Sequence, residues 1–180
     1  MINAKDILQF WFETITPKEW YKKNPEFDQD LKRRFGDLLE RASRAELFTW
    51  RECAEGRLAE IIVLDQFSRN IYRDSSAAFA QDTLALALSQ EAVRSGCLEQ
   101  LNPAQQAFML MPFMHSESAL IHEQALTLFG RPGLEDNLRF EHRHKDIIDR
   151  FGRYPHRNKV LKRNSTEAEL IFLETPGSSF

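Results

Sequence analysis

Apolar residues recur every three or four positions along most of the chain. Ile7, Leu8, Trp11 and Phe12 form one such stripe, and residues 56–68 contain a second, more strongly apolar one. This spacing is typical of helices that bury one face, and no segment alternates apolar and polar residues for more than a few positions, as a strand would. We therefore predict helices over residues 3–15, 18–23, 27–43, 56–68, 77–95, 103–112, 113–129, 134–151 and 167–173, with short helical turns near Leu47 and after Pro155.

Capping residues support several of these boundaries. Gly96 and Gly152 follow periodic segments and suit the left-handed residue that often ends a helix. Asn102-Pro103 has the residue types that begin a helix. Thr166 and Glu169 have the spacing of a capping box at the start of the last helix.

The length of 180 residues and the hydrophobic content of 42% fit one domain with its own core. Because the connections are short, consecutive helices are expected to lie antiparallel, so we predict an all-α fold of about seven to ten helices. The predicted domain spans residues 1–175, and residues 176–180 are expected to fray. No apolar stretch approaches the ~20 residues of a membrane span, and no signal peptide is evident, so we expect a cytoplasmic protein without membrane contact.

The formal net charge of −3 is unevenly distributed. Residues 139–163 hold nine basic and three acidic residues, a net charge of +6, which leaves −9 for the rest of the chain. A general nucleic-acid binder is usually strongly basic, so nucleic acid is not an expected partner. The basic segment could instead attract a small anion or an acidic face of the protein itself.

The first polar motif is LDQFSRNIYR, residues 64–73. Asp65 shares a helix face with three preceding apolar residues, and a buried carboxylate must be paired or protonated. Arg69 and Arg73 follow at intervals of one helical turn, and Asn70 could bond backbone groups at the helix end. Two interpretations stay open: a buried Asp65–Arg69 pair that fixes packing, or a carboxylate that holds an arginine for an anionic ligand.

The second motif is MPFMHSES, residues 111–118. Pro112 is predicted to end one helix, which leaves His115 and Glu117 in or near the first turn of the next. There they could simply bond exposed backbone amides. As chemistry, His115 would be a general acid or base with Glu117 as its orienter, although positions two apart on a helix do not face each other. His144 is a third candidate for proton transfer.

The third motif is RFGRYPHRN, residues 150–158. Gly152 and Pro155 predict a tight turn between two helices. Cationic or titratable side chains around such a turn could converge on one anion, or could bond helix carbonyls and buried acids such as Asp65. The candidate ligand-binding residues here are Arg150, Arg153, His156, Arg157 and Asn158, with Arg163 shortly after.

No metal site and no cofactor are predicted. His115 and His122 are two helical turns apart, roughly 10 Å, which is too far to share an ion. Glu141-x-x-His144 is the one pair with ExxH spacing, whereas a di-iron bundle needs two such pairs and two further glutamates.

The motifs together resemble a bacterial family defined only as a domain of unknown function, number 924. The resemblance rests on ILxFWF at the start, on LDQFSRNIYR and MPFMHSES, on His144 followed by IIxRFGRYPHRN, and on LKRNSTEAELIFL. It implies an all-α, TPR-like superhelical or bundle arrangement and brings no substrate or reaction. This chain has Lys162 where glycine is usual in the family, and Ser118 where aspartate is common.

Three hypotheses of function remain, and the sequence does not decide whether the chain is an enzyme. In the first, a pocket binds a small anion and a histidine (His115, His144 or His156) transfers a proton. The second is a TPR-like scaffold for a peptide or protein partner, with self-association as one form. In the third, the polar motifs are a buried network that only specifies the fold. The first hypothesis predicts that the motifs meet in one cleft and that some arginines are unpaired, the candidates being Arg69, Arg73, Arg153, Arg157 and Arg163.

Overall fold

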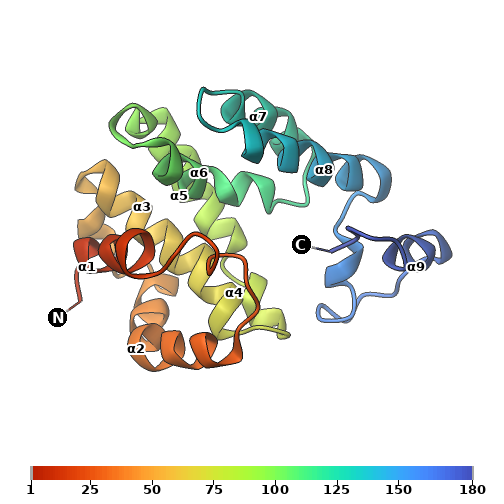
Figure 1. Cartoon of the computed structure of the whole chain (residues 1–180), viewed down its shortest axis with the longest axis horizontal. Coiled ribbons are helices and arrows are strands. Elements are labelled where there is room, and N and C mark those ends of the chain that lie inside the picture. The colour runs from red at the N-terminus through yellow and green to blue at the C-terminus, as the bar shows by residue number, and fades with distance from the viewer. Residues whose placement is uncertain (1, 180) are drawn as a thin grey trace.

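Helices account for all the regular structure in a computed structural model of the chain, which describes residues 2–179 and contains no strand over that range (Figure 1). The α-helices are α1 (Ala4–Gln9), α2 (Pro25–Ser43), α3 (Ala54–Ile62), α4 (Ser68–Ile71), α5 (Asp82–Arg94), α6 (Pro103–Met114), α7 (Ala119–Phe129), α8 (Glu135–Phe151) and α9 (Glu167–Leu173). Tighter or wider helical turns are η1 (Phe10–Thr14), η2 (Phe48–Glu52), η3 (Val63–Phe67), η4 (Ser76–Phe79), η5 (Cys97–Gln100) and η6 (Pro155–Arg157). The prediction of an all-α fold is confirmed.

A buried helical segment lies at the centre of the fold. α3 continues through η3 into α4, and every residue from 58 to 68 is buried. This segment contacts α1, α2, α5 and α6, so it has no face left for water. The one acid on α3 within this stretch, Glu60, is neutralised by both Nε and Nη2 of Arg51, at 2.7 and 2.6 Å.

Aromatic rings join the N-terminal helix to this centre. Trp11 is fully buried, and its ring centroid lies 5.6 Å from those of Phe67 and Phe108. Phe35 of α2 lies 5.1 Å from Phe67 by the same measure. Such tilted and edge-to-face contacts are the favoured geometries of aromatic pairs, and they fix η1, α2 and α6 around η3.

From α5 to α8 the chain forms successive packed helix pairs, which run from green to blue in Figure 1. Gly152 then takes the left-handed conformation, with φ of 68°, and redirects the chain into η6 and α9. A second, smaller apolar cluster forms there from Ile147, Ile148 and Tyr154 with two partly buried phenylalanines. Within the tail, Ser178 is buried and donates a hydrogen bond to the Leu173 carbonyl, and the last residue of the predicted tail, 180, lies outside the described residues.

Two predicted helices are wrong. Residues 17–21 form a turn and residues 22–24 have no regular structure, although the Glu19 carboxylate accepts from the amide and hydroxyl of Thr16 as at a helix start. The helix predicted over residues 77–95 is divided into η4 and α5, so that α5 begins at Asp82. This break lets Asp82 reach two arginines described below.

The predicted role of Pro112 is also wrong. α6 runs through Pro112 to Met114, and α7 begins only at Ala119. His115 is therefore the C-cap of α6, and His115 to Ser118 form a connecting loop instead of a first helical turn. Among residues 2–179, no helix is both long and apolar enough to cross a membrane.

Candidate functional site

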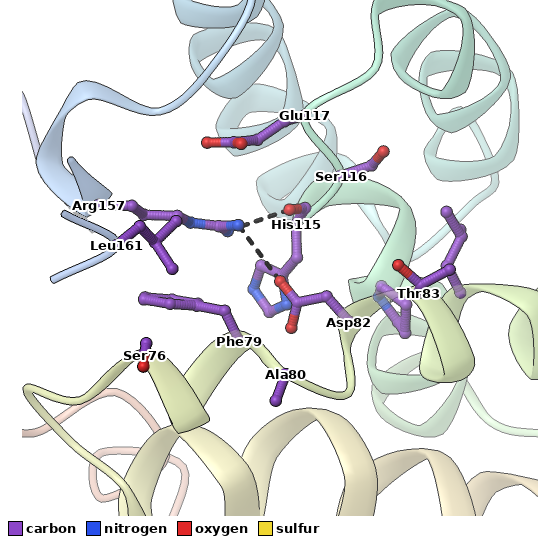
Figure 2. Close-up of a pocket in the computed structure, with 12 residues that line it drawn as sticks. Ser76, Phe79, Ala80, Asp82, Thr83, His115, Ser116, Glu117, Arg157 and Leu161 are labelled. Carbon is purple, nitrogen blue, oxygen red and sulfur yellow. Dashed lines mark hydrogen bonds and ion pairs between the residues drawn. The ribbon is translucent and has the colours of Figure 1, made fainter. Parts of the chain in front are cut away.

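A cavity of about 310 Å³ is lined in part by residues of the second and third polar motifs (Figure 2). One side comes from η4 and the first turn of α5, another from the end of α6, and the third from the segment that follows Gly152. The charged or titratable lining residues are Asp82, His115, Glu117 and Arg157, and Phe79, Leu86 and Leu161 supply apolar walls.

Asp65 orients His115 at the edge of this cavity. The His115 Nδ1 atom lies 2.7 Å from Asp65 Oδ1, and the Gln66 amide donates to the other carboxylate oxygen at 2.6 Å. Asp65 is almost fully buried in η3, which turns the carboxylate toward the end of α6. The carboxylate that orients His115 is thus that of Asp65, whereas Glu117, which was predicted for this role, contacts Tyr154 and Arg163.

The environment sets the charges of this pair. Burial by itself would raise the pKa of Asp65, but the charge of Arg69 and the hydrogen bonds from His115 and Gln66 outweigh it and hold the pKa well below its usual range. Burial and the nearby Arg69 guanidinium lower the pKa of His115. A neutral His115 that donates from Nδ1 to ionised Asp65 keeps a lone pair on Nε2, and no atom of the described residues hydrogen-bonds to Nε2.

The predicted buried ion pair of Asp65 and Arg69 is present, with Nη1 3.1 Å from Oδ1. Arg69 also forms a bidentate ion pair with Asp82, in which Nη1 and Nη2 donate to the two carboxylate oxygens at 2.8 and 3.0 Å. Arg69 is thus held between two carboxylates. The interruption of the helix between η4 and α5 brings the second carboxylate, that of Asp82, within reach.

Each of the five arginines named as candidates contacts a carboxylate, so the expectation that some of them are unpaired is wrong. Two guanidinium nitrogens contact both oxygens of one carboxylate in three further pairs: Arg73 with Asp28, Arg153 with Glu169, and Arg163 with Glu117. A buried or half-buried guanidinium without such a partner is costly, which explains why the fold supplies an acid for each.

Arg157 differs from these four because it has no carboxylate of its own. Its Nη1 atom lies 3.2 Å from Asp82 Oδ2, which already accepts from Arg69, and Nη2 donates to the His115 carbonyl at 3.0 Å (Figure 2). Its Nε is buried and bonds to nothing within residues 2–179. The guanidinium lies 4.6 Å from the ring centroids of both Phe79 and Tyr154, and its side chain is 7% exposed. Burial and the like charge of Arg69 lower the pKa of Arg157.

Glu117 anchors the C-terminal segment. Its carboxylate accepts hydrogen bonds from the Tyr154 amide at 2.8 Å and from Arg163 at 2.6 and 2.9 Å. These contacts outweigh burial and lower the pKa of Glu117, which is therefore an ionised anchor and a poor proton donor. Just before Arg163, Lys162 has φ of 55°, a conformation that favours the glycine usual in the resembling family.

A second histidine–carboxylate pair, which no sequence motif indicated, contacts the loop between α6 and α7. His122 and Glu141 are fully buried, with His122 Nδ1 2.5 Å from Glu141 Oε1. His122 Nε2 bonds to the Ser116 carbonyl at 2.8 Å and lies 3.2 Å from the Tyr154 hydroxyl, which donates to the Met114 carbonyl. Burial raises the pKa of Glu141. The pair therefore fixes both sides of the loop that carries His115.

Several predicted site residues lie away from the cavity lining. Arg150 stacks over Phe151, and the Asn158 amide donates to Glu169. The other predicted residues that do not line it are Asp65, Arg69, Asn70, Arg73, His144, Arg153, His156 and Arg163. Asp82 and Phe79 were missed because both lie in the predicted helix over 77–95, where an acid in a first turn or a single aromatic residue carries no functional signal. Over the described residues, no cluster of three metal-ligating side chains occurs.

The fold and site together define an all-helical protein whose polar motifs meet in one ion-pair network beside a cavity. The chain belongs to the family described as bacterial protein of unknown function (DUF924), whose sequence profile matches residues 7–177. It is similar to the solved structure of a protein of unknown function from Agrobacterium tumefaciens, with 37% identity, a TM-score of 0.88, and coverage of 95% of this chain and 96% of the other. No curated protein matches the chain.

Proposed function

We propose that the cavity binds a small anionic ligand at Arg157, beside His115, which Asp65 orients as a general base. The observation that carries this proposal is the state of Arg157: a buried guanidinium in the cavity wall whose nearest carboxylate is already shared with Arg69. Charge-assisted hydrogen bonds to an anion would compensate the positive charge of the Arg157 guanidinium. The four paired arginines near the motifs offer no comparable opportunity.

The Asp65–His115 pair supports a role in proton transfer. A carboxylate that accepts from Nδ1 fixes the tautomer in which Nε2 can accept a proton, and a lowered pKa keeps that tautomer neutral near pH 7. His115 and Arg157 also both line the cavity, so one ligand can reach both. His144 and Glu117 are less suitable, because the first does not line the cavity and the second is held in an ion pair.

Replacement of Arg157 separates this proposal from a purely architectural network. We expect Arg157→Gln to abolish the thermal stabilisation that small anions give the native protein, which should reach about 2.7 kcal/mol at a hundred times Kd. Arg73→Gln is the control: it breaks an ion pair with Asp28 that is better formed than that of Arg157 and lies outside the cavity lining, and it should leave ligand binding intact. If a broad set of small anions stabilises the native protein and Arg157→Gln equally, Arg157 does not bind them and the architectural hypothesis is favoured.

A TPR-like scaffold is the second candidate function, and one observation favours it. A mostly apolar hollow of about 360 Å³ lies between α5, α6 and α7, with Val93, Phe113 and Leu128 in its lining. An exposed apolar hollow is a common docking site for a helix or peptide. Val93→Glu should then abolish partner binding while it leaves anion binding at Arg157 unchanged.

A further inference from the structure

We infer that the ligand of the cavity is a small monocarboxylate with a hydrogen-bond donor, such as a hydroxyl group, next to its carboxylate. This inference rests on the proposed function and specifies the chemical class of its ligand. A fully ionised phosphate or a dicarboxylate is the class that the site disfavours.

The charges of the lining select a single negative charge. Two carboxylates, Asp82 and Glu117, and one guanidinium, Arg157, line the cavity. Arg69 and Arg163 neutralise the two carboxylates, which leaves the poorly compensated Arg157 to attract one further charge. A dianion would bring a second charge into the cavity, where the described lining residues offer no cation besides Arg157, so the second charge would lose hydration without gaining a partner.

The state of His115 selects a ligand that donates a hydrogen bond. Asp65 occupies Nδ1, so the free position, Nε2, is an acceptor. A carboxylate or a fully ionised phosphate has only acceptors to offer at this position. A hydroxyl group beside a carboxylate could donate to His115 while the carboxylate binds Arg157.

The cavity is large enough for a short acid, and its walls are partly apolar. A volume of about 310 Å³ lies at the small end of ligand pockets, which run from roughly 300 to 1,000 Å³. Phe79, Leu86 and Leu161 provide apolar surface for a short carbon chain.

The test compares lactate with propionate, which differ by one hydroxyl group, by calorimetry on the full chain. Inorganic phosphate is measured at a pH where it is mostly dianionic. Methyl lactate, which has no negative charge, measures the affinity that does not depend on the carboxylate. We expect lactate to bind about three- to tenfold more tightly than propionate, the usual value of one hydrogen bond. Phosphate and methyl lactate should bind more weakly than both.

Two variants test whether His115 Nε2 and the Arg157 guanidinium cause these differences in affinity. His115→Asn keeps an amide that can donate to Asp65 but has no acceptor in place of Nε2, so lactate should bind no better than propionate. Arg157→Gln should weaken both acids. If His115→Asn does not fold, the ratio of lactate to propionate affinity in the native protein decides alone.

The outcomes separate this inference from the proposed function. Tighter binding of phosphate than of lactate, lost in Arg157→Gln, would overturn the ligand class while the anion site stands. Equal affinity for lactate and propionate would overturn the requirement for a donor. If no acid and no phosphate binds in an Arg157-dependent way, the proposed function fails as well.

Discussion

His144 and His156, which flank the site, are held neutral by their surroundings. Burial is the main cause for both, and it lowers the pKa of His144 to about 3 and that of His156 to about 4, from an ordinary value of 6.5. The positive charge of Arg157 adds to the effect at His156. Because the unfolded chain would bind these protons near pH 6.5, the two histidines couple folding to pH.

We expect the free energy of unfolding to fall as the pH drops below about 6.5. A lowered pKa in the folded state means that the stabilising contribution is complete above the unfolded value and is lost as the pH falls toward the folded value. For His144 the loss between pH 7 and pH 5 should be about 2 kcal/mol. Urea unfolding at both pH values measures it.

His144→Gln serves as the comparison for this prediction. His144 Nδ1 contacts the Phe140 carbonyl at 2.7 Å, and a glutamine amide can donate in its place without titrating. The groups whose charges act on His144 are His115, His122 and His156, and all of them remain in the variant. An unchanged pH dependence in His144→Gln would contradict this assignment.

At the scale of elements, the close approach of η2 to α3 depends on Gly56. A Cβ atom at Gly56 would overlap the carbonyl oxygen of Trp50, so only glycine lets the two backbones meet there. Gly36 on α2 is different, since the one atom near its Cβ position is Lys32 Cγ at 4.0 Å.

These two glycines give a matched pair of substitutions. Gly56→Ala should destabilise the protein by about 2 kcal/mol or more, because a backbone segment must move. Gly36→Ala should stabilise it by about 0.5–1 kcal/mol, because alanine is the better helix former and meets open space. Thermal unfolding of both variants measures these effects, and a loss of stability in Gly36→Ala equal to that in Gly56→Ala would contradict the explanation.

The elements that the sequence predicts well are those with local signals. α2, α8 and α9 have an apolar stripe, and α9 has a capping box that the structure confirms. The break before Asp82 has no such local signal, and the contact that it allows with Arg157 joins residues 75 positions apart. The ion pair of Asp65 and Arg69 could be predicted, because the two residues are one helical turn apart. A partner from another part of the chain, such as Asp65 for His115, could not be predicted in this way.

For the whole molecule, the main feature is the difference between its two apolar clusters. The large one includes buried residues from Ile7 to Leu134, whereas the small one has Ile147, Ile148 and Tyr154 as its buried members. The segment after Gly152 is joined to the rest largely by polar contacts, among them Arg157 with Asp82 and Arg163 with Glu117. A region with little apolar burial tends to open at a lower free energy than the core.

We therefore expect the segment over residues 153–173 to open as a unit below the free energy of global unfolding. Native-state hydrogen exchange should show lower protection for the amides of α9 than for those over residues 58–67, which should exchange only by global unfolding. Glu169→Gln should widen this difference, because the Glu169 carboxylate accepts from Arg153, Asn158 and the Thr166 amide. Equal protection in the two regions would mean that the polar contacts hold the segment as firmly as the core.

Arg157 and Leu161 line the cavity and belong to this segment, so its opening would disrupt the cavity. A bound ligand should therefore slow hydrogen exchange in this segment first.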